Sequence, residues 1–208
     1  MRVSIRSRWW RAAMLAAALS WPSTSPAWAQ ADDIYLRLDR TLTFVDGRDA
    51  VVKSTDFEGK WLLVYFGYMH CADLCPWGLT VLGAALDLLG PAVRHVQPLF
   101  VTVDPERDHG KALVEFTASF HGRLVGLTGT EPEIRAAADA MAVKFSKVAQ
   151  GADYAVDHSS SYTLIAPDRR TVLTFRKAEA HMVAAKVVEV LERSGLQLEG
   201  VSGLRAGR

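Results

Sequence analysis

The only two cysteines of the chain, Cys71 and Cys75, are separated by three residues and followed directly by Pro76. Two thiols at this spacing can bind a soft metal ion or close a disulfide. Because the residue before a proline avoids the α region and proline favours the first helical position, we predict that Cys75 lies near a helix N-cap, with Cys71 in the loop before it. The positive end of that helix would favour the thiolate form of both sulfurs.

The cysteines follow a continuous apolar run, Trp61 to Phe66, which is typical of a central strand with both faces buried. The segment from Trp77 to Leu89 shows the periodicity of a helix. The pair therefore lies where a strand ends and a helix begins, which is the edge at which open α/β sheets place their chemistry.

The rest of the pattern predicts an α/β fold. Apolar runs on either side of Asp46-Gly47 indicate an N-terminal β-hairpin, and Thr130 to Glu133 forms a capping box for a helix that we expect to reach Phe145. We also predict strands at 96–103, 123–127, 162–166 and 172–175, helices at 111–120 and 178–193, and an irregular hairpin around Gly151. This order is that of a thioredoxin-like fold, a central mixed sheet flanked by helices, with an N-terminal β-hairpin extension.

His158 lies in the segment that leads into the strand beginning at Tyr162. Parallel crossovers are right-handed, so the loops after Phe66 and Val103 fall on one edge of the sheet. The strand at Tyr162 runs antiparallel in this topology, so its start returns to the same edge, and we expect His158 beside the cysteines. Two thiolates and one imidazole form a soft ligand set that suits Cu(I), zinc or iron–sulfur iron, and the imidazole extends the range to Cu(II).

Three motifs resemble those of the Sco/SenC family. Phe66-Gly-Tyr-Met-His-Cys-Ala-Asp-Leu-Cys-Pro76 is similar to that family's Phe-Gly-Tyr-Thr-His-Cys-Pro-Asp-x-Cys-Pro signature, and residues 103–108 and 156–160 resemble its second and third motifs. The resemblance covers about residues 38–194. It implies a thioredoxin-fold protein that binds copper, as Cu(I) or Cu(II), and helps to assemble the CuA centre of cytochrome c oxidase. When the family's ligand positions are transferred to this sequence, the resemblance implies that Cys71, Cys75 and His158 are the metal ligands.

The first motif departs from the family signature at two positions. Met69 stands where the signature has Thr, and Ala72 stands where it has Pro. A thioether can bind Cu(I), but a methionine at a strand end more often packs in the core.

Two functions stay open for these residues. The first is a metallochaperone that delivers copper to, or prepares, the CuA-bearing subunit of cytochrome c oxidase or another cuproprotein client. The second is a thiol–disulfide oxidoreductase in which Cys71 and Cys75 are the catalytic redox pair that reduces cysteines of a respiratory or other exported client protein. The Cys-x-x-Cys of thioredoxin-type reductases is absent, however. A peroxidase-like thiol enzyme would need cationic neighbours, and residues 72–74 provide none.

Residues 1–31 have the pattern of a secretory signal peptide. Four arginines are followed by an apolar run, 12–19, that is too short to span a bilayer, and small residues permit cleavage after Ala29 or Ala31. We therefore expect a periplasmic protein with a membrane-proximal partner and no stable transmembrane segment after cleavage. Without cleavage it would stay tethered, as is usual in the family. The expected domain is 32–198, and 199–208 form a flexible tail.

Charge excludes one class of partner. The chain has 24 basic and 23 acidic residues, and because four arginines belong to residues 1–31, the remainder is slightly acidic. It therefore lacks the net basic field on which nucleic-acid binding usually depends. The remaining length suits one domain with a sizeable apolar core, which leaves the cysteine pair available for chemistry.

Overall fold

A computed structural model describes residues 33–71 and 74–205 of this chain, and residues 1–32, 72–73 and 206–208 lie outside the described part. The β-strands are β1 Ile34–Arg37, β2 Thr43–Asp46, β3 Val51–Lys53, β4 Trp61–Gly67, β5 Val96–Thr102, β6 Val125–Thr128, β7 Phe145–Gln150, β8 Asp153–His158, β9 Tyr162–Ile165 and β10 Thr171–Phe175. The α-helices are α1 Leu74–Leu88, α2 Gly110–Phe120, α3 Glu131–Ala140 and α4 Ala180–Arg193.

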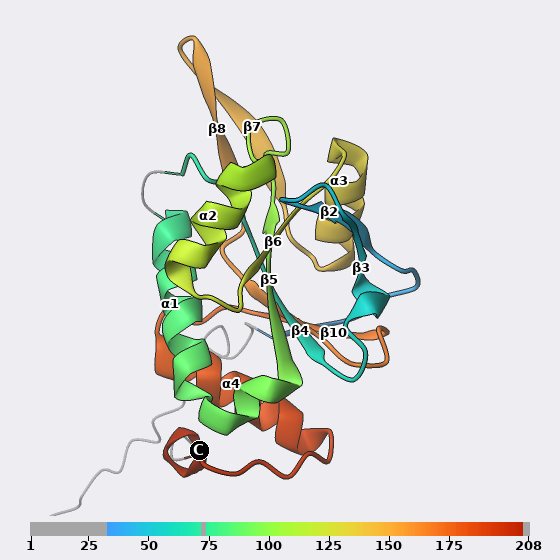
Figure 1. Ribbon diagram of the computed structural model, residues 1–208, viewed down its shortest axis with the longest axis vertical. Helices are drawn as coiled ribbons and strands as arrows, with labels where there is room; N and C mark the ends of the chain where they lie inside the picture. The colour runs from blue at the N-terminus through green and yellow to red at the C-terminus, as the bar shows by residue number, and fades with distance from the viewer. Residues whose placement is uncertain (1–32, 72–73, 206–208) are drawn as a thin grey trace, which may run out of the picture. The chain divides into compact units, whose positions relative to one another are not determined.

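Strand β4 lies in the middle of an eight-stranded sheet with the order β1-β10-β9-β4-β5-β6-β2-β3 (Figure 1). β4, β5 and β6 are parallel, whereas β9 pairs antiparallel with the other side of β4. The predicted N-terminal hairpin is formed by β2 and β3, and β2 extends the sheet beside β6. All seven residues of β4 are buried, which explains why no polar residue alternates in this run.

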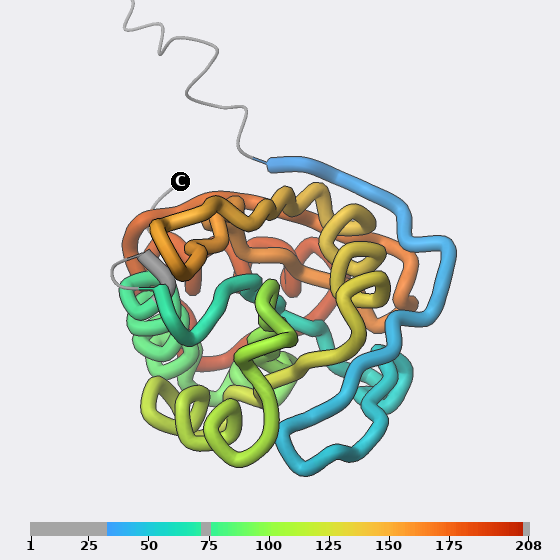
Figure 2. The backbone as a smooth tube through the Cα atoms, turned by 90° about the horizontal axis from the view of Figure 1, so that it is seen from above, coloured from blue at the N-terminus to red at the C-terminus, as the bar shows by residue number. Residues whose placement is uncertain are grey.

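Alternate residues of β4 enter two apolar cores on opposite faces of the sheet, as the two-residue period of a strand requires. One core contains Trp61, Leu63 and Tyr65, and the other contains Leu62, Val64 and Phe66. Helices α1, α2 and α4 cover the first face and α3 covers the second, and the view in Figure 2 shows helices on both sides. A Cβ atom at Gly78 would overlap the Tyr65 ring, so only glycine lets α1 lie this close to β4.

The ends of β4 and β5 and the start of β9 meet at one edge of the sheet, as predicted. Gly67 at the end of β4 pairs with Thr102 at the end of β5, and Tyr65 pairs with Tyr162 at the start of β9. The segments that follow β4 and β5 and the segment that precedes β9 therefore leave the sheet at this edge.

Helix α1 begins earlier than the sequence predicted. It starts at Leu74, so Cys75 is the second residue of the helix and lies near its N-cap, as predicted. Pro76 is tolerated at this position because N–H groups of the first turn have no partner within the helix.

Helix α3 begins as predicted and ends earlier. Thr130 forms its capping box with Glu133. The predicted extension to Phe145 is wrong, because Ala142 has a φ of 55° and the Val143 N–H turns back to the Ala138 carbonyl at 2.8 Å. This left-handed residue ends the helix without the glycine that usually marks such a position.

Strands β7 and β8 form a two-stranded sheet where the sequence indicated an irregular hairpin around Gly151. His158 is the last residue of β8 and not part of a loop. Strand β1 was not predicted. Its residues Ile34 and Tyr35 are 43% and 62% exposed, so the strand lacks the buried apolar pattern that sequence reasoning detects.

The predicted signal peptide, residues 1–31, lies outside the described part of the chain. Among residues 33–71 and 74–205, no helix is both long and apolar enough to cross a bilayer. In the predicted tail, Val201 is buried and the Arg205 guanidinium donates to Glu192 at 2.7 Å. The tail therefore packs against the domain at least as far as Arg205.

Candidate functional site

Cys71 lies in the turn that follows β4. Its backbone N–H donates to the Tyr68 carbonyl at 3.4 Å, and its half-buried side chain packs against the core on the α3 face of the sheet. The turn places Cys71 at the sheet edge where chemistry was expected.

Tyr68 connects the turn of Cys71 with His158. The side chain of Tyr68 is buried, and its ring lies edge-on to the imidazole, with ring centroids 6.0 Å apart and planes at 85°. One residue therefore contacts the Cys71 backbone through its carbonyl and His158 through its ring. This arrangement brings Cys71 and His158 to the same site, although they are far apart in sequence.

The surroundings of His158 favour its neutral form. Burial lowers the pKa of His158, against the opposing effects of the Ser159 carbonyl and the Asp157 carboxylate. Nδ1 lies 3.2 Å from the Ser159 carbonyl oxygen. When Nδ1 carries the proton and donates to that oxygen, the lone pair of Nε2 is available to a metal.

Cys75 lies four positions after Cys71 in the sequence, but only its backbone lies within the described part of the structure. That backbone belongs to the first turn of α1, where the helix dipole favours a thiolate. Among the described side chains, no three His, Cys, Asp or Glu residues gather as a metal site. Because the Cys75 side chain is outside that set, the trio of Cys71, Cys75 and His158 stays a prediction.

Met69 and His70, the neighbours of Cys71, have other contacts. Met69 packs against the core on the α1 face of the sheet, and its N–H donates to Asp108 Oδ2 at 2.7 Å. His70 Nδ1 lies 3.5 Å from Asp108 Oδ1. The core contact of Met69 agrees with a packing role for this side chain.

The sequence marked Asp108 only as part of the second family motif, whereas the structure places it at the candidate site. Its carboxylate is fully buried, and besides Met69 it accepts a hydrogen bond of 2.7 Å from the Thr102 hydroxyl. Asp108 therefore anchors the turn of Cys71 to the end of β5. An acidic residue before a helix usually faces solvent, so no local sequence signal marks this long-range contact.

Asp108 should give the protein a measurable pH dependence of stability. Burial raises the pKa of Asp108, with Asp104 adding to the effect, so the folded state holds its proton to higher pH than the unfolded state does. The resulting stabilisation is fully present below the unfolded pKa of about 3.9 and is lost as pH rises through the folded pKa. The measurement is urea denaturation of the wild type and of Asp108→Asn, which cannot titrate at this position. The free energy of unfolding of the wild type, minus that of the variant, should fall as the pH rises through this range. A difference that grows with pH would contradict this and show that the hydrogen bonds to the carboxylate outweigh its desolvation.

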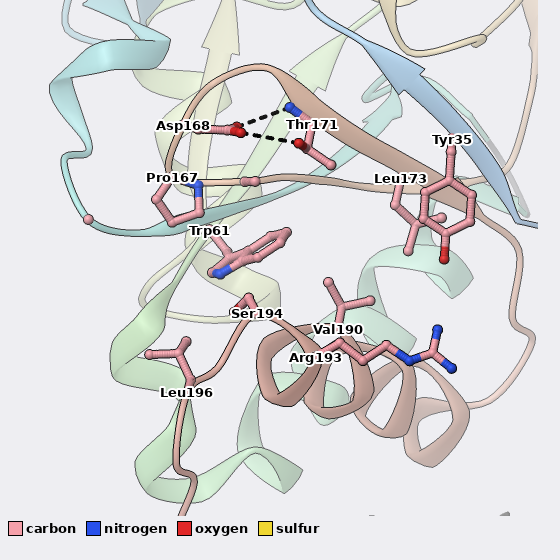
Figure 3. A pocket seen from close by; sticks show the side chains of 12 residues that line it. Tyr35, Trp61, Pro167, Asp168, Thr171, Leu173, Val190, Arg193, Ser194 and Leu196 are labelled. Carbon is pink, nitrogen blue, oxygen red and sulfur yellow. Dashed lines mark hydrogen bonds between the residues drawn. The ribbon is translucent and has the colours of Figure 1, made fainter.

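A separate apolar hollow of about 540 Å³ lies at the opposite edge of the sheet (Figure 3). Its lining includes Trp61, the first residue of β4, together with Tyr35 and Leu173. Cys71 follows the other end of β4, so this hollow is not part of the candidate metal site.

Comparisons with known proteins point to one family. A family model described as SCO1/SenC matches residues 35–192. The chain is similar to the mitochondrial SCO2 homolog of Danio rerio, with 44% identity over 117 residues, which are 54% of this chain and 42% of that protein. The chain spans about half the length of the curated relatives it matches.

Solved structures share the fold. The copper-bound ScoI of Arabidopsis thaliana matches with a TM-score of 0.68 and 32% identity, covering 74% of this chain and 98% of that one. The copper-bound ScoI of Bradyrhizobium japonicum matches with a TM-score of 0.65 and 31% identity, covering 72% of this chain and 97% of that one. The predicted thioredoxin-like α/β fold is confirmed by this agreement.

Proposed function

The chain belongs to the SCO1/SenC family, and from this premise we propose that it is a copper metallochaperone that binds copper through Cys71, Cys75 and His158. The observation that carries the proposal is the position of Tyr68, which contacts both the turn of Cys71 and the imidazole of His158. The copper-bound state of two similar structures supports copper as the cargo.

The chemistry of these residues fits copper. Thiolates are soft ligands that bind Cu(I), and a neutral imidazole binds both Cu(I) and Cu(II). Since burial lowers the pKa of His158, this ligand needs no deprotonation at neutral pH. Binding then releases protons only from the thiols of Cys71 and Cys75.

A second function, thiol–disulfide exchange, is favoured by the location of Cys75 in the first turn of α1. In that reaction the thiolate of one cysteine attacks a disulfide of the client, and the second cysteine resolves the mixed disulfide. Cys71 and Cys75 become oxidised to a disulfide, and the client gains two thiols. The same residues serve both functions, but only copper binding needs His158.

The client and the compartment follow from the same proposal. We infer that copper passes to the CuA-bearing subunit of cytochrome c oxidase or to another cuproprotein, at the periplasmic face of a membrane. The signal-like pattern of residues 1–31 supports export. Trp77 supports a docking role for this edge, because this residue is 62% exposed near the start of α1, two positions after Cys75 in the sequence.

Copper titration of the reduced and oxidised protein tests the proposal. Reduced protein should bind one copper per chain, and the Cu(II) form should show an intense sulfur-to-copper absorption band. Oxidation of Cys71 and Cys75 to a disulfide removes both thiolates, so the oxidised protein should bind no copper at comparable concentrations. Mixing the loaded protein with a metal-free CuA domain should then transfer the metal. Oxidised protein that keeps a full equivalent of copper would contradict the ligand assignment.

A further inference from the structure

The hairpin that carries His158 depends on side-chain contacts for its position. In the described part of the chain, β7 and β8 pair only with each other, and the hairpin projects from the body of the domain (Figure 1). Within β8, Tyr154 and Val156 share one face with His158, because side chains of a strand alternate. Val156 is buried, so this face is turned toward the domain. The contacts that hold this face of β8 against the domain therefore also set the orientation of the His158 imidazole.

Arg107 binds the hairpin from the loop that follows β5. Its Nη1 donates to Asp153 Oδ1 at 3.1 Å and its Nη2 to the Tyr154 carbonyl at 3.2 Å. The guanidinium also lies over the Tyr154 ring, 3.9 Å from the ring centroid. A planar guanidinium is suited to this combination of forked donation and stacking, which a lysine ammonium cannot reproduce.

Asp104 completes the link between loop and hairpin. Its buried carboxylate accepts a hydrogen bond from Arg107 Nε and one of 2.8 Å from the Tyr154 hydroxyl. Its backbone N–H donates to the Thr102 hydroxyl at 2.9 Å, which fixes the loop to the end of β5. The exposed ion pair of Lys147 with Glu106 adds a weaker contact between the same two segments.

The same loop also holds the turn of Cys71. At its far end, Asp108 accepts the Met69 N–H at 2.7 Å, two residues before Cys71. Residues 104–108 therefore bind the hairpin of His158 through Asp104 and Arg107 and the turn of Cys71 through Asp108. The loop sets the separation between the thiol and imidazole parts of the candidate site.

We propose that Arg107 and Tyr154 are positioning residues, which fix β8 so that His158 faces the cysteines before copper arrives. This inference rests on the proposed function and adds two residues to it. A ligand that is already in place loses less conformational freedom on binding, so preorganisation raises affinity. Neither side chain needs to touch the metal for this effect.

Two variants, Arg107→Ala and Tyr154→Phe, test the inference. The second removes only the hydroxyl that donates to Asp104 at 2.8 Å and to Glu106 at 3.4 Å. In the metal-free protein, amides of β8 should exchange with solvent faster in both variants, and more so in Arg107→Ala. Cu(II) affinity should fall about tenfold in Arg107→Ala and less in Tyr154→Phe. The nitrogen hyperfine coupling from His158 should weaken in the electron paramagnetic resonance spectrum. Arg107→Lys should not restore it.

A double-mutant cycle with His158→Ala separates positioning from a general structural effect. If Arg107 acts through His158, then Arg107→Ala should not lower affinity further when His158 is already absent. The matched control is Arg123→Ala, because Arg123 also donates to backbone carbonyls, those of Val93 and Val96 at the other end of β5. This control should leave affinity, spectrum and exchange of β8 unchanged.

The possible outcomes distinguish this inference from the proposed function. If His158→Ala weakens copper binding while Arg107→Ala does not, or if Arg107→Ala weakens it equally in both backgrounds, the positioning role is refuted and the metallochaperone proposal stands. If His158→Ala leaves affinity and spectrum unchanged, the ligand set itself is wrong, and the positioning role fails with it. Tyr154→Phe keeps the test decisive should Arg107→Ala fail to fold.

Discussion

Replacing either cysteine with serine is expected to lower copper affinity by at least about a thousandfold, equal to about 4 kcal/mol of binding free energy. Cys71→Ser and Cys75→Ser each exchange a soft thiolate for a hydroxyl, which is a poor ligand for Cu(I) and is not deprotonated near neutral pH. Affinity is measured by competition with a chromogenic Cu(I) chelator under reducing conditions. The sulfur-to-copper band of the Cu(II) form should weaken strongly in either variant.

The control for this experiment is His70→Ala, which removes the imidazole of the residue that precedes Cys71. The His70 side chain is mostly exposed and its Nδ1 lies 3.5 Å from Asp108, so we expect its loss to change copper affinity less than threefold. Circular dichroism of each variant checks that the fold is intact. A folded serine variant with wild-type affinity would refute the assignment of that cysteine, and a large loss in His70→Ala would identify His70 as a competing ligand.

The sequence predicted the elements that are determined by burial. The apolar run of β4 is typical of a central strand, and all seven of its residues are buried. Thr130 and Glu133 marked the start of α3 because a capping box is a local signal. The end of α3 was missed because Ala142, which has no special backbone freedom, adopts the left-handed conformation there.

Long-range contacts between polar residues could not be predicted from the sequence. Topology alone indicated that His158 approaches the cysteine segment, since β9 runs antiparallel to β4. The contacts of Asp108 with Met69 and of Arg107 with Tyr154 join residues that are distant in sequence and carry no periodic pattern. The motif in 103–108 did mark the loop that follows β5. That this loop links the hairpin of His158 to the turn of Cys71 depends on the tertiary fold.

His158→Ala is the variant that separates copper delivery from thiol exchange. Losing one of the three proposed ligands should lower copper affinity by about a hundredfold, equal to about 2.8 kcal/mol of binding free energy. Thiol exchange should stay within about twofold of the wild-type rate. The reason is electrostatic: burial lowers the pKa of His158 and keeps the imidazole neutral, so its removal leaves the charge around the thiolates unchanged.

The decisive comparison measures CuA assembly in cells that carry His158→Ala at limiting copper, beside a disulfide-exchange assay on the same purified variant. A metallochaperone should lose CuA assembly while the variant still exchanges disulfides, because copper dissociates before it reaches the client. Cys71→Ser serves as the reference, since it removes a residue that both functions need. If His158→Ala cells assemble CuA normally while Cys71→Ser cells do not, the sulfurs act by reducing the client and not by carrying copper. The geometry around Tyr68, which joins the turn of Cys71 to the imidazole, favours the first outcome.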